Sequence, residues 1–311
     1  MIGHRTPERH TLKNGGVVII QCGRQIKTEE IELICETVKT FSCLSRNELV
    51  NTVCEHLGWY TASGGNKVDA CLKLLKTMET RGLIQLPAQR DITYKPRKKQ
   101  VIKVKALDQK PVEGKLADIG PINLRIVKDK EETLLFNEYL RRHHYLGYTK
   151  PFGCFLRYFI EGPDALLGCL LFSGAAKAIT PRDKWIGWSP NERLRNQGFV
   201  VNNSRFLIFS WIKVRYLASH VLGKVVKALA QDWQQRWSYR PVLLETFVDP
   251  QYFAGTCYQA ANFKYLGMTS GMGLSRQGKN YKTTPKKIFV YPLVDNFQQI
   301  LSQNTFGRVS G

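Results

Sequence analysis

The chain has 311 residues, with 46 lysines and arginines against 25 aspartates and glutamates, which gives a formal net charge of +21. Its hydrophobic content of 43% is enough to build folded cores, so wholesale disorder is excluded, and 25 glycines and 13 prolines without a period exclude a collagen-like or low-complexity chain. A large positive charge repels itself unless a polyanion neutralises it, so nucleic acid is favoured over a membrane surface. The alternative is a solvated basic surface without a partner.

Several signals place the protein in the cytoplasm. The longest apolar stretches, residues 165–176 and 241–248, are shorter than the roughly 20 residues that a membrane helix needs. The N-terminus shows no secretory signal. Eight cysteines without a C-x-x-C pair predict reduced core residues rather than a disulfide framework, and the sequence assigns no metal and no cofactor.

Residues 1–90 show helical periodicity and helix-end signals. Ser45 and Glu48 form a capping box, and Gly58 is a predicted helix stop. Helices are expected over Thr28 to Phe41, Ser45 to Gly58 and Asn66 to Thr80, followed by a short strand from Leu83 to Pro87.

This order predicts a winged helix-turn-helix DNA-binding domain in residues 1–90, followed by a basic linker or wing in residues 91–120. The third helix is expected to enter the major groove by its N-terminal part. The expected DNA contacts are Arg46, Asn66, Lys67, Lys73, Arg97, Lys98 and Lys99. The alternative is a three-helix interaction module.

The positive charge is distributed unevenly. Residues 1–90 hold 12 lysines and arginines against 9 acidic residues, residues 91–130 hold 11 against 5, and residues 131–311 hold 23 against 11. Because most of the excess lies beyond residue 90, we expect the C-terminal domain itself to touch DNA. Lys279 and Lys282, in a second basic stretch, join the expected contacts.

Residues 122–291 alternate strand and helix signals in the order β-α-β-β-β-α-β-α-β. The expected segments are Ile122 to Val127, Glu131 to Arg142, Cys154 to Ile160, Leu166 to Phe172, Phe199 to Phe209, Leu217 to Trp237, Pro241 to Val248, Thr256 to Leu266 and Ile288 to Leu293. A loop rich in tryptophan and polar residues is expected between the fourth and fifth segments.

The order of these segments resembles that of the GNAT N-acyltransferases. The likeness is sharpest at Tyr258 to Phe263, which is similar to the Tyr-x-x-x-Gly-Phe segment of the fourth GNAT helix. The resemblance implies a GNAT-like mixed α/β domain over residues 121–311. In that superfamily the helix tyrosine often serves as general acid toward a leaving thiolate, and for Tyr258 the resemblance implies the position and not this chemistry. Residues 213–220 depart from the family, because they lack the glycines of the loop that usually binds the acyl-CoA pyrophosphate. Ser219 and free N–H groups there suit a phosphate, including a DNA phosphate.

A more specific resemblance rests on short motifs that occur in order between residues 143 and 267. The motifs are His144 to Gly147, Leu167 to Ala176, Pro181 to Trp188, Val201 to Phe206, Leu217 to His220, Leu244 to Asp249 and Gly255 to Tyr258. Together they resemble the DruA family of the Druantia anti-phage systems, a domain also found beside or fused to transposases. The resemblance implies a setting of phage defence or mobile DNA, with partners among defence-system or transposase proteins.

Three residues are candidate catalytic groups: one within a predicted strand, one at its end and one in the helix that follows. Glu245 lies in an otherwise apolar run, where burial favours a carboxyl suited to general base work. Asp249 follows at the strand end, and Tyr258 lies in the next helix. Because ligands gather at the carboxyl ends of strands in open α/β sheets, we expect the three around one pocket. The alternative is that Glu245 pairs structurally with Arg205 or Arg157.

His143 and His144 lie at the end of a predicted helix, where the helix dipole favours a cation. Helix capping is therefore the first interpretation of these residues. The alternative, a proton shuttle or metal ligands beside carboxylates, adds His144 to the catalytic candidates.

Asn203 and Arg205 are candidates for holding a flipped or single-stranded base. Aromatic residues near them in sequence or in the neighbouring loop are Trp185, Trp188, Trp211 and Tyr216. The alternative is that these aromatics pack in the core or in loops. Arg215, at the start of the long helix, adds an expected DNA contact.

The sequence thus predicts a DNA-binding protein of an anti-phage defence or mobile-element system that contacts duplex or partly single-stranded DNA with both domains. Two alternatives stay open. One is a DNA-directed enzyme that transfers a group to a base or cleaves a strand, using a pocket around Glu245 and Tyr258. The other is an acyl-CoA-dependent N-acyltransferase.

Overall fold

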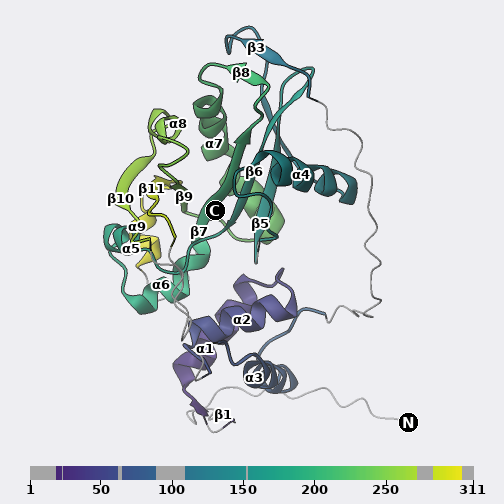
Figure 1. Ribbon diagram of the computed structural model, residues 1–311. Helices are drawn as coiled ribbons and strands as arrows, with labels where there is room; N and C mark the ends of the chain where they lie inside the picture. The colour runs from purple at the N-terminus through teal and green to yellow at the C-terminus, as the bar shows by residue number, and fades with distance from the viewer. Residues whose placement is uncertain are drawn as a thin grey trace, which may run out of the picture.

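The computed structural model describes residues 19–22, 24–61, 65–88, 109–151, 153–271 and 283–302. A mixed α/β part lies above a smaller group of helices (Figure 1). The main sheet has seven strands in the order β10-β11-β9-β7-β6-β5-β4. Their bounds are β4 Asn123–Ile126, β5 Phe155–Glu161, β6 Leu166–Gly174, β7 Val200–Ile208, β9 Leu243–Val248, β10 Lys264–Met268 and β11 Lys287–Pro292.

The helices and the short strands complete the described chain. The helices are α1 Thr28–Thr40, α2 Arg46–His56, α3 Val68–Thr80, α4 Lys130–His143, α5 Thr180–Ile186, α6 Pro190–Asn196, the 3-10 helix η1 Gln197–Phe199, α7 Leu217–Trp237, α8 Thr256–Ala260 and α9 Phe297–Leu301. The short strands are β1 Ile19–Gln21, β2 Arg24–Ile26, β3 Val112–Gly114 and β8 Ile212–Val214.

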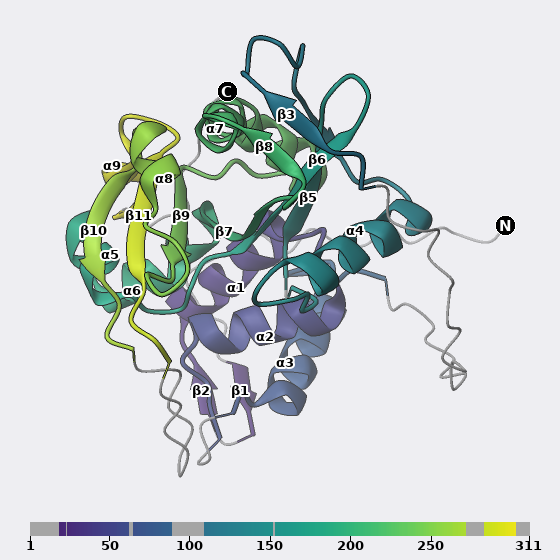
Figure 2. The ribbon, with the colours of Figure 1, turned by 45° about the horizontal axis from the view of Figure 1, so that its top comes forward.

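The long helices α4 and α7 cover opposite faces of the sheet (Figure 2). Phe159 of β5 contacts Tyr139 of α4, with ring centroids 6.4 Å apart. Its neighbour Tyr158 donates a hydrogen bond of 2.8 Å to Asp232 of α7. Because successive strand residues point to opposite faces, these two contacts place the helices on the two sides.

The centre of the sheet contains one parallel pair, β7 with β9. The two strands pair only from Val200 to Asn202 and from Leu243 to Glu245, although β7 continues to Ile208 and β9 to Val248. All the other pairs in this sheet are antiparallel and span the strands more fully. The sheet therefore divides between β7 and β9 beyond the third paired residue.

A β-bulge lies on β7 where this division begins. Leu171 of β6 is opposite Arg205 while Phe172 is opposite Asn203, so Ser204 is the extra residue. Asn203 and Ser204 donate side-chain hydrogen bonds of 3.3 and 3.2 Å to the Leu171 carbonyl. These side chains replace a ladder hydrogen bond that the bulge removes, and a bulge increases the local twist of its strand.

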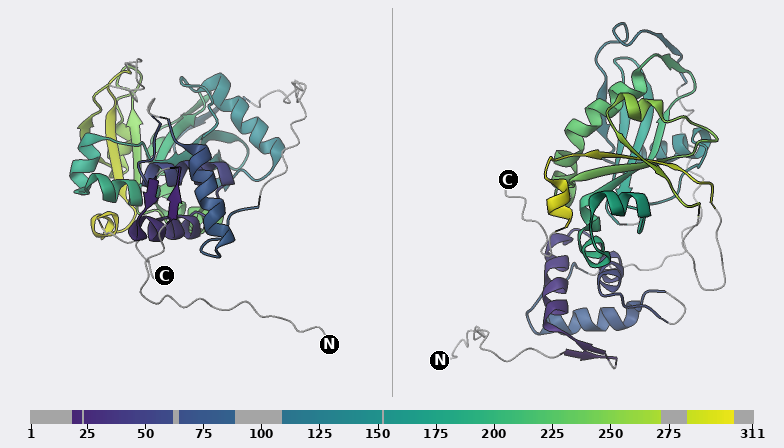
Figure 3. Two further views of the ribbon diagram at one scale, coloured as in Figure 1. Left: turned by 90° about the horizontal axis from the view of Figure 1, so that it is seen from below. Right: turned by 90° about the vertical axis from the view of Figure 1, so that its left-hand side faces the viewer.

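The helices α1, α2 and α3 group beneath the α/β part (Figure 3). Phe41, after α1, packs edge-on against Tyr239, after α7, with ring centroids 5.2 Å apart. Glu48 of α2 accepts a hydrogen bond of 3.2 Å from the Gly153 N–H, and Glu55 forms an ion pair with Lys177. Apolar packing and polar contacts together join the two parts of the chain.

Most of the predicted elements are confirmed, including the Ser45 capping box and a left-handed Gly58. Three expectations are wrong. Residues 83–87 form no strand, and the predicted loop of residues 175–198 contains α5 and α6. The predicted helix of residues 256–266 ends at Ala260 and is followed by β10.

The segment predicted as linker contains one strand of the α/β part. β3 pairs in parallel with β8 from Val112 to Gly114, so this stretch is attached to the C-terminal part. Within the described segments, no helix combines the length and hydropathy that a bilayer crossing requires.

Gly198 lies at the contact between the helical part and the α/β part, so a substitution there tests how closely the two parts pack. A Cβ atom added at Gly198 would lie 2.5 Å from Cζ of the buried Phe41 ring. We expect Gly198→Ala to lower the free energy of unfolding by about 1–3 kcal/mol through overpacking, measured by urea denaturation. Gly223→Ala is the matched control, because nothing lies within 4 Å of its added Cβ and alanine favours a helix. Equal stability of the two variants would contradict close packing at this contact.

Candidate functional site

A cavity of the α/β part lies where β7 and β9 separate. Its volume is about 360 Å³, within the range of small-molecule sites. Residues 203–204 and 206–208 of β7 and 246–248 of β9 form its sides, and residues 143–146, 253–258 and Ala218 of α7 complete the lining. The lining is mainly apolar, with a small number of polar side chains.

Tyr258 and Asn203 form a hydrogen-bonded pair in the lining. The Tyr258 hydroxyl donates to Asn203 Oδ1 over 2.9 Å, and Thr246 Oγ1 donates to the Asn203 carbonyl over 3.1 Å. Burial raises the pKa of Tyr258 above its ordinary value, so the hydroxyl keeps its proton at neutral pH. The Asn203 amide also donates to the Arg205 carbonyl. With 4% exposure, Asn203 is held by these internal hydrogen bonds and lines the cavity, so DNA contact by its side chain stays a prediction.

His144 lies at the C-terminal cap of α4 and lines the cavity. Its Nδ1 accepts a hydrogen bond of 3.1 Å from the Leu146 N–H. Burial, with the nearby Arg205 guanidinium, lowers the pKa of His144 to about 4. His144 is therefore neutral at neutral pH, so it does not cap the helix as a cation. In the described part of the chain, no three His, Cys, Asp or Glu residues gather at a metal-binding distance.

Asp249 ends β9 as predicted, but its carboxylate serves the neighbouring turn. It accepts hydrogen bonds from the Thr284 hydroxyl over 2.7 Å and from the Gln251 N–H over 3.0 Å. The Thr284 hydrogen bond, with smaller effects of the Gln251 N–H and Lys286, holds the pKa of Asp249 below its ordinary value. Asp249 thus fixes the turn that follows β9.

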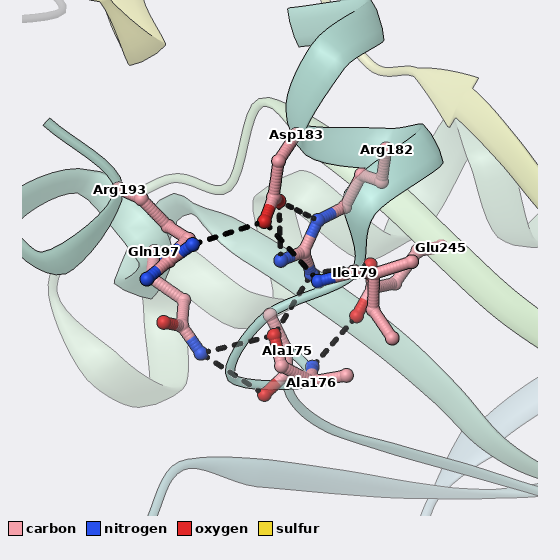
Figure 4. A network of polar contacts seen from close by, with 8 residues as sticks. All are labelled: Ala175, Ala176, Ile179, Arg182, Asp183, Arg193, Gln197 and Glu245. Atoms are coloured by element: carbon pink, nitrogen blue, oxygen red, sulfur yellow. Dashed lines mark hydrogen bonds and ion pairs between the residues drawn. The ribbon is translucent and has the colours of Figure 1, made fainter. Parts of the chain in front are cut away.

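Glu245 is fully buried in a polar network on the other side of β9 (Figure 4). Glu245 Oε2 accepts from Arg182 Nη1 over 2.8 Å, and Oε1 accepts from the Ala176 N–H over 2.8 Å. Arg182 also pairs with Asp183, which in turn accepts from Arg193 over 3.2 Å. Burial lowers the Arg182 pKa but is outweighed by the Glu245 and Asp183 carboxylates, so the pKa is raised.

The expectation that Glu245, Asp249 and Tyr258 surround one pocket is wrong for Glu245 and Asp249, because only Tyr258 lines the cavity. Thr246, the next residue of β9, lines the cavity, and alternation along the strand turns Glu245 to the opposite face. The structural pairing of Glu245 is confirmed, but with Arg182 instead of the predicted Arg205 or Arg157. Arg157 donates to the Tyr148 hydroxyl and Arg205 to the Gly147 carbonyl. Arg205 is half-buried, so DNA contact by its side chain stays a prediction.

The predicted DNA contacts in the helical part divide into two groups. The Arg46 guanidinium donates to the Pro87 carbonyl, and the Asn66 amide donates to Asn51 over 2.9 Å, so both are used internally. Lys67 and Lys73 are exposed at and near the start of α3. Outside the described residues lie Arg97, Lys98, Lys99, Lys279 and Lys282.

The aromatic residues that line the cavity differ from those predicted to surround the base site. Trp185 stacks on Phe297, Trp188 lies under the Arg182 guanidinium, and Trp211 stacks on Phe209, and these three are absent from the cavity lining. Tyr216 is 71% exposed at the start of α7, beside the exposed Arg215. The aromatics that reach the cavity are Tyr145, Phe206, Phe247, Phe253 and Tyr258.

The buried ion pair predicts a strong effect on stability. Glu245→Gln removes one of the two carboxylate charges that compensate the fully buried Arg182, so we expect a loss of about 3 kcal/mol of unfolding free energy, measured by urea denaturation. The double variant Arg182→Met with Glu245→Leu leaves no uncompensated charge at the pair and should recover part of this loss. Wild-type stability in Glu245→Gln would contradict the structural role.

The neutral histidines predict acid sensitivity. The pKa of His144 and that of half-buried His56 lie at about 4 in the folded protein, against an unfolded value of about 6.5. The unfolded chain therefore binds more protons between these values, and stability falls as the pH drops from about 6.5 to 4. His144→Gln should reduce this slope in urea midpoints measured from pH 7 to 5, and leave the profile parallel to wild type above pH 7. An unchanged acid slope would show that His144 has the same pKa in the folded and the unfolded protein.

Several solved structures resemble the chain at low identity. One is a Bacillus subtilis acetyltransferase in complex with CoA, with 8% identity over 56% of this chain and 100% of that chain, at a TM-score of 0.34. An aminoglycoside acetyltransferase in complex with coenzyme A shows 16% identity over 55% and 95%, at a TM-score of 0.36. The N-acyl amino acid synthase FeeM from uncultured soil microbes shows 14% over 58% and 95%, at 0.34. At these scores the likeness supports no cofactor or activity here.

The family comparison is more specific. No curated protein matches the chain. The model of the family described as Druantia protein DruA matches residues 77–276, which is more than half of the chain. This range includes the Arg182–Glu245 network and all residues that line the cavity. The chain belongs to the DruA family.

Proposed function

We propose that this DruA-family chain is a DNA-binding protein of an anti-phage defence or mobile-element system, and that it contacts DNA with both its helical part and its α/β part. The family assignment supports the setting, and the net charge of +21 supports the polyanionic partner. The α/β part is proposed to be GNAT-like in the order of its strands and helices.

The observation that carries the proposal is a basic surface along α7. Residues 213–240 contain six lysines and arginines and one acidic residue, Asp232, which accepts a hydrogen bond from Tyr158. The apolar face of α7 is buried, whereas the cations are exposed or half-buried. These cations are Lys213, Arg215, Lys224, Lys227, Arg236 and Arg240.

Of these six cations, Lys213 forms an ion pair with Glu113 over 3.0 Å, whereas those on α7 itself form none within the described residues. Within the described segments, Lys224, Lys227 and Arg236 have no carboxylate at ion-pair distance. By contrast, Arg141 and Arg142 of α4 both pair with Glu138. Cations without acidic neighbours are free to neutralise phosphates and release their counterions.

The helical part is proposed to act as a winged-helix-like reader with α3 toward DNA. Lys67, Lys73 and Lys76 are exposed along α3, with Asp69 as the acidic residue of its first turn. The hairpin β1–β2 precedes α1, so the described strands of this part do not follow α3 as a wing would. The lysines of α3 support a phosphate contact more directly than base reading.

Binding is favoured over catalysis by the position of Glu245. The alternative enzyme hypothesis needed Glu245 and Tyr258 in one pocket, and the network with Arg182 keeps Glu245 outside it. For an acyl-CoA enzyme, the start of α7 lacks the glycine loop, and Tyr216 adopts a left-handed conformation there with φ of 65°.

A salt titration with charge-matched variants tests the proposal. We expect log K for a DNA duplex to fall linearly with log salt, because bound cations release counterions from the phosphates. Lys224→Gln with Lys227→Gln should reduce the slope by about 1 for each phosphate that the variant no longer neutralises. Fluorescence anisotropy with a labelled duplex measures both quantities.

The control is Arg141→Gln with Arg142→Gln, which changes the net charge by the same amount at residues already paired with Glu138. This control should keep a slope close to wild type. A flat salt dependence in the wild-type protein, or equal reductions of the slope in the two double variants, would overturn the assignment of the DNA surface to α7.

A further inference from the structure

Three exposed aromatic side chains meet at the mouth of the cavity, and we call Tyr145, Tyr252 and Phe253 the aromatic rim. Their exposed fractions are 37%, 59% and 55%. The ring centroids of Tyr145 and Tyr252 are 4.6 Å apart, and those of Tyr145 and Phe253 are 5.6 Å apart. His144 also stacks on Tyr145, with ring centroids 4.9 Å apart. Aromatic residues in such numbers on a surface indicate a binding site more than a solvent face.

The rim is built on two loops that the fold holds in place. The Asp249 carbonyl accepts from the N–H groups of Tyr252 and Phe253 over 3.1 and 3.0 Å, which closes the turn after β9. In the other loop, Arg205 donates to the Gly147 carbonyl over 2.9 Å. Rings fixed by their backbones lose little freedom when a planar ligand stacks on them, so the rim is prepared for stacking.

The polar groups beneath the rim suit a ligand with a hydrogen-bonding edge. The hydroxyls of Tyr258, Thr246 and Ser204 all donate to partners inside the protein, so they offer lone pairs to the cavity. Neutral His144 accepts at Nδ1, so its Nε2 carries a proton that can be donated. Acceptors and a donor beside an apolar wall match a nucleobase, which has π faces and a mixed donor and acceptor edge.

The charge beside the rim favours a nucleic acid strand over an apolar peptide or lipid. Within the described segments, the Arg205 guanidinium has no carboxylate at ion-pair distance, and it is close enough to Tyr145 to affect its pKa. The nearby carboxylate of Asp249 is held by Thr284 and Gln251, with Lys286 close by. An unpaired cation next to stacked aromatic rings is the combination that binds unpaired nucleotides.

We propose that the aromatic rim and the cavity below it bind one unpaired nucleobase of a DNA strand, which stacks on Tyr145, Tyr252 and Phe253 and places its edge between β7 and β9. The proposal rests on the DNA binding proposed above and adds that this protein distinguishes DNA with an unpaired base from continuous duplex. The cost of removing a base from the stack is lowest where the base is already unpaired.

The test compares three labelled duplexes of one sequence: fully paired, with one bulged adenine, and with one bulged abasic nucleotide. We expect about tenfold tighter binding of the adenine bulge than of the other two duplexes. The stacking of one base on aromatic side chains strengthens binding by about a factor of ten or more. The abasic bulge separates recognition of the base from recognition of a bent backbone.

Variants of the rim complete the test. In Tyr252→Ala and in Phe253→Ala, affinity for the adenine bulge should fall to that for the paired duplex. Tyr265→Ala, an exposed aromatic residue of β10 outside the rim, is the control and should keep the preference. Equal affinity of the wild-type protein for the adenine and abasic bulges, or a preference that survives both rim substitutions, would overturn this proposal while leaving duplex binding intact. A lack of salt-dependent affinity for any duplex would instead overturn the proposed function.

Discussion

The structure depends on the short pairing between two parallel strands of the main sheet. The parallel strands β7 and β9 share three paired positions and then separate, while each stays bonded to its antiparallel neighbour on the outer side. Backbone groups that face the gap have no ladder partners, and such groups need other partners. Thr246 of β9 supplies one such hydrogen bond, to the Asn203 carbonyl of β7, while the Asn203 and Ser204 side chains serve the bulge between β6 and β7. The cavity is therefore a consequence of how the sheet divides, and its sides come from strands instead of mobile loops.

The Arg182–Glu245 ion pair acts on the same strand from the opposite face. Glu245 is the last residue of β9 that pairs with β7, so its carboxylate is fixed where the strands begin to separate. Its two partners, Arg182 and the Ala176 N–H, belong to the segment between β6 and β7. The network thus ties α5 to the last paired position. A buried ion pair of this kind adds little stability by itself, but removal of either charge alone is costly. The pair therefore favours one arrangement of α5 against the last paired position of β9.

Much of the fold was predictable because the signals were local. The periodicity of α1 and α7, the Ser45 capping box and the apolar runs of β6 and β9 all appear within short windows of sequence. The site was less predictable. α5 and α6 have seven residues each, too few to show a period, and Arg182 meets Glu245 across 63 residues of sequence. The aromatic rim joins Tyr145 to Tyr252 from two separate loops, a contact that spacing alone does not reveal. The signal that was available was the strand alternation between Glu245 and Thr246, which places these neighbours on opposite faces.

Because the helical part packs against the α/β part, the basic side chains of both parts are held in a fixed arrangement. Phe41 packs on Tyr239, which follows α7 directly and also contacts Phe199 before β7. The exposed lysines of α3 and the cations of α7 are thus carried on parts that pack together, not on independent bodies joined by a basic linker. A DNA partner neutralised by both surfaces must fit their fixed separation, so binding by the two parts depends on the contact at Phe41. The same contact links the cations of α7 to the division of the sheet, because Val242, just before β9, donates to the Phe199 carbonyl. The proposed DNA surface and the cavity between β7 and β9 are therefore built on one continuous core.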